Sequence, residues 1–302
     1  MPPLVLTAGH SRLELVPEVG GAISRLASVE DDGDAFDWLR PASAEHVEDR
    51  DVGGMSCFPL VPFSNRVADA RFTFEGRSIA LTPNFPPEPH AIHGFGWQSA
   101  WGVAARDDHT ATLEYAHHAD AWPFPFLARQ HFRLSPDLLE ITMDVTNVGT
   151  ERMPVGFGWH PFFVRTPGMR LHAHVDRVWL AGAGHLPERL ADVPGSWGLT
   201  GGLNPSAVAL DSNFTGWDGR VRVDWPDRDA ALEMTIEGPF SFLVIYTPPA
   251  ADYACAEPVS NVIDAFNLAA SGRDDTGMRV LVPGARISGT VRLRMEPPPR
   301  RP

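Results

Sequence analysis

The sequence predicts an all-β protein with the architecture of a large antiparallel β-sandwich. Apolar and polar residues alternate along many short segments from one end of the chain to the other, which is typical of strands with one buried face. The 29 prolines and 27 glycines are spread throughout, as expected where short strands are joined by many turns. No helical periodicity exceeds two turns, and no fixed-period repeat suggests a propeller or a solenoid.

The clearest elements, in chain order, begin with a predicted β-hairpin. Residues 71–74 and 78–81 alternate and are joined by residues 75–77, where Gly76 supplies the turn. Later strands are predicted wherever apolar side chains occupy every second position. These segments are residues 113–115, 139–145, 232–236 and 287–293.

The chain shows no internal linker. The proline-rich segments 84–89 and 246–249 are short and lie between apolar strands. We therefore expect residues 1–302 to form one domain. Residues 296–302 are rich in proline, which cannot donate to a sheet, so we expect this tail to be frayed.

Composition excludes several functional classes. The 25 basic and 38 acidic residues give a net charge of −13, the wrong sign for binding nucleic acid. Every basic residue is arginine, so no lysine is available for a Schiff base or a P-loop. The hydrophobic share of 43% is ordinary for a globular chain, and no apolar run approaches the ~20 residues that span a bilayer.

The ends and the cysteines indicate a cytoplasmic protein. The first residues contain no basic group and no sustained apolar stretch, both of which a secretory signal requires. The two cysteines, Cys57 and Cys255, have neither C-x-x-C nor metal-ligand spacing. We expect both to be buried free thiols.

Twelve histidines raise the question of a metal site. Zinc sites draw three or four ligands at recognisable spacings, and none of the close histidine pairs has an evident third partner. We therefore expect no metal. The pairs are His90 and His93, His117 and His118, and His172 and His174.

Four segments combine ionisable side chains with glycine, proline and aromatic residues. Taken singly, Arg66 is compatible with a surface position, His160 with a hydrogen-bonded core histidine and Glu257 with a strand-end carboxylate. Their joint order is more informative: an Asn-Arg pair, a His-Gly pair, a His-Pro pair flanked by aromatics, and a Glu-Pro pair. The segments are residues 62–66, 91–97, 156–163 and 254–267.

This order resembles the pattern of the aldose 1-epimerase, or galactose mutarotase, family. The resemblance extends from Gly20 to Gly284, nearly the whole chain. It implies a large antiparallel β-sandwich that interconverts the α and β anomers of free aldohexoses without a cofactor. It also implies that His160 is the general acid and Glu257 the general base.

The resemblance further implies which residues contact the sugar. Asn65, Arg66 and His93 match substrate-binding positions, and Asp211 resembles the aspartate that accepts hydrogen bonds from sugar hydroxyls. The segment around Asp211 is less distinctive than the others. Asp218 and Asp224 are the alternatives.

Aromatic residues beside these groups are candidates to cover the apolar face of a pyranose. Trp159 flanks His160 directly, and Trp97 and Phe162 lie in the same candidate segments. Core packing is the competing interpretation of each ring.

The residue types suit the reaction. A hemiacetal opens when a base removes the anomeric hydroxyl proton while an acid protonates the ring oxygen, so one carboxylate and one imidazole suffice. Their unperturbed pKa values are about 4.3 and 6.5, so the histidine must have a raised pKa to begin as the acid. We expect the neighbouring carboxylate to raise it.

Three other functions compete with this interpretation. A hexose-6-phosphate mutarotase of the same fold needs a cationic lip, and only Arg71 lies near the Asn-Arg pair. A glycoside hydrolase would use Glu257 and Asp211 as its two carboxylates. A non-catalytic sugar-binding β-sandwich would use the same contacts without proton transfer. The expected partner is a small-molecule sugar in each case, and the motifs specify neither the preferred aldose nor an oligomeric state.

Overall fold

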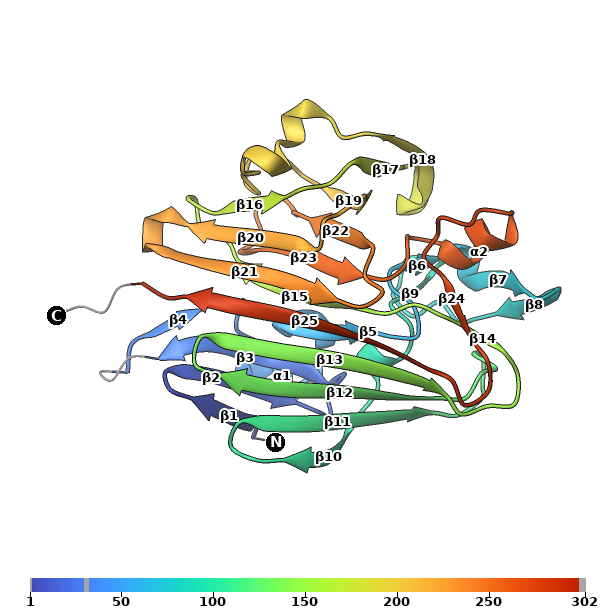
Figure 1. Cartoon of the computed structure of the whole chain (residues 1–302), viewed down its shortest axis with the longest axis horizontal. Helices are drawn as coiled ribbons and strands as arrows, with labels where there is room; N and C mark the ends of the chain where they lie inside the picture. The colour runs from blue at the N-terminus through green and yellow to red at the C-terminus, as the bar shows by residue number, and fades with distance from the viewer. Residues whose placement is uncertain (1, 30–32, 299–302) are drawn as a thin grey trace.

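Antiparallel sheets dominate the computed structural model, which describes residues 2–29 and 33–298. Within these residues, one sheet has eleven strands and another has eight. Figure 1 shows the smaller sheet in front of the larger one, so the two form the layers of a sandwich. The predicted all-β class is confirmed.

The larger sheet contains the His-Pro pair, in β15, and the Glu-Pro pair, in β23. Its strands, taken across the sheet, are β1 (Leu4–Ala8), β2 (Ser11–Val16), β3 (Ala22–Val29), β5 (Cys57–Leu60), β15 (Gly158–Val164), β23 (Tyr253–Val259), β22 (Phe242–Tyr246), β19 (Asp211–Thr215), β17 (Arg177–Ala181) and β18 (Pro187–Asp192), with β4 (Ala35–Asp37) beside β3.

The smaller sheet is built mostly from long hairpins. Its strands, taken across the sheet, are β10 (Gly102–Arg106), β11 (Thr110–His117), β12 (Phe126–Ser135), β13 (Leu138–Asn147), β25 (Arg286–Glu296), β21 (Ala230–Glu237), β20 (Arg220–Trp225) and β16 (Arg170–Ala173).

Short elements complete the fold. Three two-stranded sheets pair β6 (Arg66–Val67) with β9 (Ala91–Ile92), β7 (Arg71–Phe74) with β8 (Arg77–Ala80), and β14 (Met153–Val155) with β24 (Arg279–Leu281). The α-helices are α1 (Ala44–Glu48) and α2 (Ala265–Ala270). The 3-10 turns are η1 (Val52–Gly54), η2 (Ala68–Ala70), η3 (Gly96–Gln98), η4 (Ala183–His185), η5 (Gly195–Trp197), η6 (Leu199–Gly201) and η7 (Pro226–Arg228).

The alternating segments form the strands they predict. In β13, Leu139, Ile141 and Met143 are buried between the sheets, and each intervening residue is partly exposed. Burying one such side chain stabilises the fold by roughly 2 kcal/mol. The predicted hairpin is β7–β8, in which Glu75 and Gly76 have positive φ values of 48° and 78°. Two successive residues with positive φ are typical of the type I′ turn, whose twist matches the strands.

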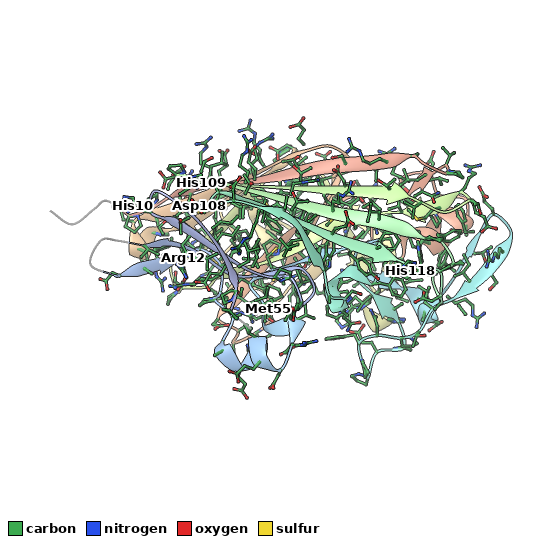
Figure 2. All side chains as sticks on the ribbon, turned by 90° about the horizontal axis from the view of Figure 1, so that it is seen from below. His10, Arg12, Met55, Asp108, His109 and His118 are labelled. Atoms are coloured by element: carbon green, nitrogen blue, oxygen red, sulfur yellow. The ribbon has the colours of Figure 1, made fainter. Side chains whose placement is uncertain are left out.

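The larger sheet is buried on both faces. Its inner face packs against the smaller sheet in the main core, which includes Trp159 and Phe163. Its outer face carries a second apolar cluster, which includes Phe58, Phe162 and Val244. In Figure 2 the smaller sheet forms the upper layer and the α1 region lies on the opposite side, near Met55.

The structure also bears on the expectations for the two cysteines and the C-terminal tail. Cys57 and Cys255 are buried and free. Glu296, which we expected in a frayed tail, ends β25 and pairs with Ala231, whereas residues 299–302 lie outside the described residues. Within the described chain, no helix is long and apolar enough to cross a membrane.

Candidate active site

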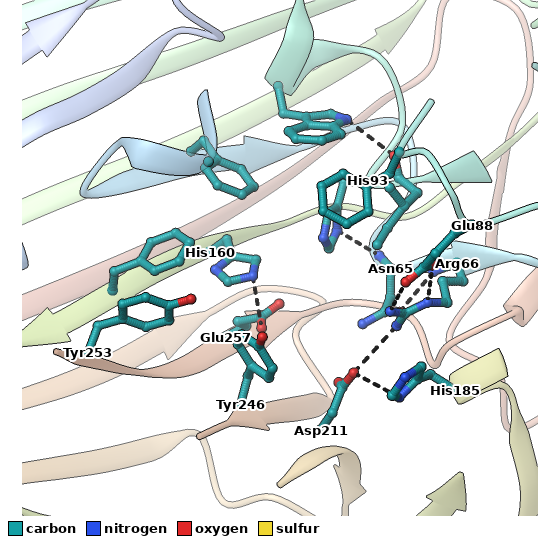
Figure 3. A pocket seen from close by; sticks show the side chains of 16 residues that line it. Asn65, Arg66, Glu88, His93, His160, His185, Asp211, Tyr246, Tyr253 and Glu257 are labelled. Atoms are coloured by element: carbon teal, nitrogen blue, oxygen red, sulfur yellow. Dashed lines mark hydrogen bonds and ion pairs between the residues drawn. The ribbon is translucent and has the colours of Figure 1, made fainter. Parts of the chain in front are cut away.

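A cavity of about 370 Å³ lies on the outer face of the larger sheet. Strands β5, β15, β23, β22 and β19 supply its floor and one wall, and the segment before β10 supplies the opposite wall (Figure 3). Its lining residues are Gly53, Phe58, Asn65, Arg66, Phe85, Glu88, Ile92, His93, Trp97, His160, Phe162, His185, Asp211, Tyr246, Tyr253 and Glu257.

His160 and Glu257 meet on the floor of this cavity. The register of β15 against β5 places His160 opposite Phe58. The register of β15 against β23 places Glu257 on the other side of His160. Paired residues of neighbouring strands share a face, so Nε2 of His160 lies 3.3 Å from Oε1 of Glu257. The structure brings the proposed acid and base into direct contact.

Aromatic rings hold the His160 imidazole. Phe162 stacks on it at a centroid distance of 4.5 Å and an angle of 15°, and Phe58 lies at 4.8 Å on a ring tilted by 33°. Its Nδ1 has no hydrogen-bond partner among the described residues, and neither does Oε2 of Glu257. The plane of the imidazole is therefore set by packing and by its contact with Glu257, and Oε2 is buried with no competing hydrogen bond among the described residues.

Burial changes the protonation of this pair from what the sequence suggested. Glu257 is only 2% exposed. Desolvation raises its pKa well above the ordinary value, and the nearby charge of Asp211 adds to the effect. Desolvation also lowers the pKa of His160 to about 3. The expectation that the carboxylate raises the histidine pKa is thus wrong, because the cost of burying a charged imidazole is larger.

His93 is fixed as a hydrogen-bond donor toward the cavity. The backbone N–H of Asn65 donates to His93 Nδ1 at 3.1 Å, so the proton of the neutral ring resides on Nε2. Burial, together with the neighbouring His160 and Arg66, lowers the pKa of His93 well below its usual value. His93 therefore stays neutral and presents an N–H.

Gly94 allows the wall of the cavity to approach β5. Its φ is +70°, and a Cβ at this position would collide with the Val61 carbonyl. We expect Gly94→Ala to lower the free energy of unfolding by about 2 kcal/mol more than Gly76→Ala does. Gly76 has a similar φ of +78°, but a Cβ there meets nothing within 4 Å among the described residues. Urea unfolding of both variants isolates the steric part, and equal losses would contradict this account.

Arg66 is held from several directions. Glu88 accepts from Nε at 2.7 Å and from Nη2 at 2.8 Å, a two-pronged ion pair. Asn65 Oδ1 accepts from Nη1 at 3.2 Å, and Asp211 Oδ2 lies 3.6 Å from the same nitrogen. The backbone oxygen of Arg66 accepts from the Asp264 N–H. The guanidinium is therefore fixed beside the floor of the cavity.

Asp211 is the aspartate that the structure places in the cavity. It begins β19, opposite Tyr246 of β22, and its Oδ2 also lies 3.3 Å from His185 Nδ1. The alternatives lie elsewhere. Asp218 caps a turn before β20, and Asp224 pairs with His172 and Arg222 on the smaller sheet.

Trp159 does not line the cavity, so its assignment as a sugar contact is not supported by the geometry. Successive side chains of a strand point to opposite faces, so Trp159 faces the main core when His160 faces the cavity. There its Nε1 donates to Gln130 at 3.0 Å, and its ring packs on Phe240. Trp97 and Phe162 do line the cavity.

Several cavity residues were not identified from the sequence, and five of them have side chains suited to contact a sugar or to hold one that does. Tyr246 and Tyr253 line the lower wall, with ring centroids 6.3 Å apart. Phe85, 49% exposed, and Glu88 come from the proline-rich segment 84–89. His185 comes from η4. A carboxylate and an aromatic ring among prolines, just before the His-Gly pair, were the available signals.

The histidines do not gather into a metal site. No group of three or more His, Cys, Asp or Glu side chains in the described chain is arranged to hold a metal ion. Figure 2 shows His10 and His109 near one end of the molecule and His118 near the other.

Comparisons with known proteins agree on the family. A family model described as aldose 1-epimerase matches residues 3–294. The uncharacterised Escherichia coli K12 protein YphB is 31% identical over 313 residues, 97% of this chain and 99% of its own. An E. coli K12 crystal structure assigned provisionally as an aldose 1-epimerase has a TM-score of 0.88 at 28% identity, with 98% and 99% of the two chains covered. A galactose mutarotase-like protein from Clostridium acetobutylicum shares the fold, with a TM-score of 0.83 at 22% identity over 97% and 94% of the chains.

Proposed function

Because this chain belongs to the aldose 1-epimerase family, we propose that it interconverts the α and β anomers of free, uncharged aldohexoses. The observation that carries the proposal is the contact of a buried imidazole and a buried carboxyl group, 3.3 Å apart, on the floor of a cavity lined by aromatic rings. One group of such a pair can donate a proton to a bound sugar while the other accepts a proton from it.

Glu257 and His160 each transfer one proton when the sugar ring opens and one when it closes. Glu257 removes the proton from the anomeric hydroxyl, and the electron pair left on that oxygen forms the C1 carbonyl. The bond from C1 to the ring oxygen breaks as His160 protonates that oxygen. The open aldehyde rotates about C1–C2, and the same steps in reverse close the ring on the other face. No atom is gained or lost, and the pair returns to its starting state.

The pair can enter this cycle because it holds one proton in total, even though burial favours the uncharged arrangement of the two groups. The raised pKa of Glu257 and the lowered pKa of His160 place that proton on the carboxyl group in the empty site. Transfer across the 3.3 Å contact gives the imidazolium and carboxylate that the reaction needs. The neutral pair and the imidazolium–carboxylate pair each hold one proton, so a change in pH does not alter the ratio between them.

The cavity offers suitable contacts for a pyranose. Arg66 and Asp211 provide a donor and an acceptor side by side, which suits adjacent hydroxyl groups. The N–H of His93 adds a third polar contact. Trp97 and Phe162 supply apolar surface for the C–H face of the ring.

The alternatives fit this geometry less well. Arg66 is the only arginine among the described residues that line the cavity, and Glu88 and Asp211 already lie beside it, so the lining offers a phosphate no arginine without a carboxylate partner. The group in contact with Glu257 is an imidazole instead of the second carboxyl group of a glycoside hydrolase. A binding module has no need of a proton-sharing pair on its floor.

NMR exchange spectroscopy on free hexoses tests the proposal directly. The purified protein should accelerate α–β exchange of at least one neutral aldohexose and leave hexose 6-phosphates near their uncatalysed rates. Binding without acceleration would support a sugar-binding protein, and release of a second sugar from a glycoside would support a hydrolase. Either result would contradict the proposal.

We expect activity to survive exhaustive chelation. The proposed steps need only proton transfer, and His160 and Glu257 supply both groups. The measurement is the exchange rate before and after dialysis against EDTA. A loss that zinc restores, and that buffer exchange alone does not cause, would show that a metal participates.

A further inference from the structure

Glu88 has an unusual position for a carboxylate in a sugar site. It lines the cavity, yet both of its oxygens are occupied by the Nε and Nη2 atoms of Arg66, at 2.7 and 2.8 Å. We propose that Glu88 is a specificity-determining residue, whose charge makes the cavity reject anionic sugars such as hexuronates and sugar phosphates. The inference rests on the proposed function in one respect, that this cavity is where the sugar binds.

The donors of Arg66 show how the rejection arises. A guanidinium has five N–H groups. Glu88 takes two of them, and Asn65 Oδ1 takes a third at Nη1. The remaining donors suffice for neutral hydroxyl groups. Glu88 occupies the Nε–Nη2 edge, so a carboxylate or phosphate could pair only with the Nη1–Nη2 edge, and there Asp211 Oδ2 already lies 3.6 Å from Nη1.

The charge balance around Arg66 points the same way. Glu88 and Asp211 lie on two sides of the Arg66 guanidinium. Hydrogen bonding to Arg66 lowers the pKa of Glu88, so this carboxylate stays ionised at neutral pH. An anion that approaches Arg66 therefore meets two carboxylates beside one guanidinium, in a partly buried site where repulsion is stronger than in water.

The role is separable from that of Asp211. Asp211 has one oxygen near Arg66 and His185 and contributes an acceptor for a hydroxyl group. Both Glu88 oxygens already accept from Arg66, so its main effect is to balance the charge of that guanidinium. Removing its charge should therefore alter the response to anions much more than the response to neutral sugars.

The test uses Glu88→Gln, with inorganic phosphate and a hexuronate as probes. The amide keeps the shape and one acceptor but removes the charge, so Arg66 keeps its positive charge without a balancing carboxylate and loses one of its two hydrogen bonds to position 88. We expect phosphate affinity, measured by calorimetry, to rise on the order of tenfold or more. The exchange rate of the hexuronate relative to the neutral hexose should rise by a similar factor.

Glu114→Gln is the matched control. It makes the same change in net charge and breaks an ion pair of the same kind, Glu114 Oε2 with Arg129 Nε at 2.7 Å. That pair joins β11 and β12 on the smaller sheet, away from the cavity. Its phosphate affinity should match that of the wild type.

Glu88→Asp covers the case in which the glutamine variant does not fold. Aspartate keeps the charge on a shorter side chain, so it should retain the discrimination against anions even if a looser Arg66 raises KM. Wild-type phosphate affinity in folded Glu88→Gln, or lost discrimination in folded Glu88→Asp, would overturn the proposal. The phosphate measurement requires no catalysis, so it stands apart from the wild-type assay with neutral hexoses, whose failure would instead refute the proposed function.

Discussion

Glu257→Gln should lower the rate of anomer exchange by at least about a hundredfold while the protein remains folded. The amide has nearly the shape of the carboxyl group but cannot accept the anomeric proton. Oε2 of Glu257 has no other hydrogen-bond partner among the described residues, so the substitution breaks no described hydrogen bond of that atom. The measurement is NMR exchange at equal protein concentration, with Glu114→Gln as the control. Retention of more than about a tenth of the wild-type rate would contradict the assignment.

The same substitution has a predicted effect on stability. The folded pKa of Glu257 is raised above its unfolded value, so its contribution to stability is full below the unfolded pKa. That contribution is lost as pH rises toward the folded pKa. Glutamine has no such dependence, so the variant should gain stability relative to the wild type as pH increases. Urea unfolding at an acidic and an alkaline pH measures this difference, and a loss of stability that grows with pH would be the opposite result.

His160→Asn should cost a comparable factor in rate and change the pH profile. In the wild type, activity requires the pair to hold one proton. The acid limb of kcat/KM should lie near the His160 pKa of about 3, and the alkaline limb should lie well above an ordinary glutamate pKa. Below the acid limb the pair lacks a base, and above the alkaline limb it lacks an acid. The resulting plateau is wider than free glutamate and histidine would give.

In His160→Asn the acid limb should disappear, because the group that titrates there is gone. His174→Asn is the control, since its side chain is exposed and its nearest charged partner, Asp176, is exposed as well. A variant at position 160 with a near-wild-type rate and an unchanged alkaline limb would show that another residue is the acid. His93 would then be the first residue to replace, because it lies 5.5 Å from His160, centroid to centroid.

The sequence predicted the parts of the site that short segments encode. Alternation identified β13 and β25 separately, but their pairing joins residues nearly 150 positions apart and depends on the whole core. His160 and Glu257, which both line the cavity, could be proposed from the sequence because their segments carry distinctive neighbours, whereas Glu88 and His185 enter the cavity on loops placed by tertiary contacts.

Two errors have definite physical causes. Residues 158–163 are buried without interruption, so no alternation in hydrophobicity indicates that Trp159 and His160 face opposite ways. The protonation of His160 depends on how deeply it is buried, and a motif carries no measure of depth. The orientation of these side chains and the burial depth of His160 both depend on the segments that cover the outer face of the larger sheet, so they are known only from the tertiary structure.

Strand β15 serves the two faces with interleaved residues, and this restricts how the gene can change. Trp159 and Phe163 face the main core, and His160 and Phe162 face the cavity. A substitution can therefore change the residues that face one side of the strand without changing those that face the other. Deleting a single codon within the strand would shift its register by one residue and turn each side chain to the opposite face, placing an imidazole in the core and an indole over Glu257. Within this strand, evolution is confined to replacement, and length changes have to be accommodated in the loops on either side.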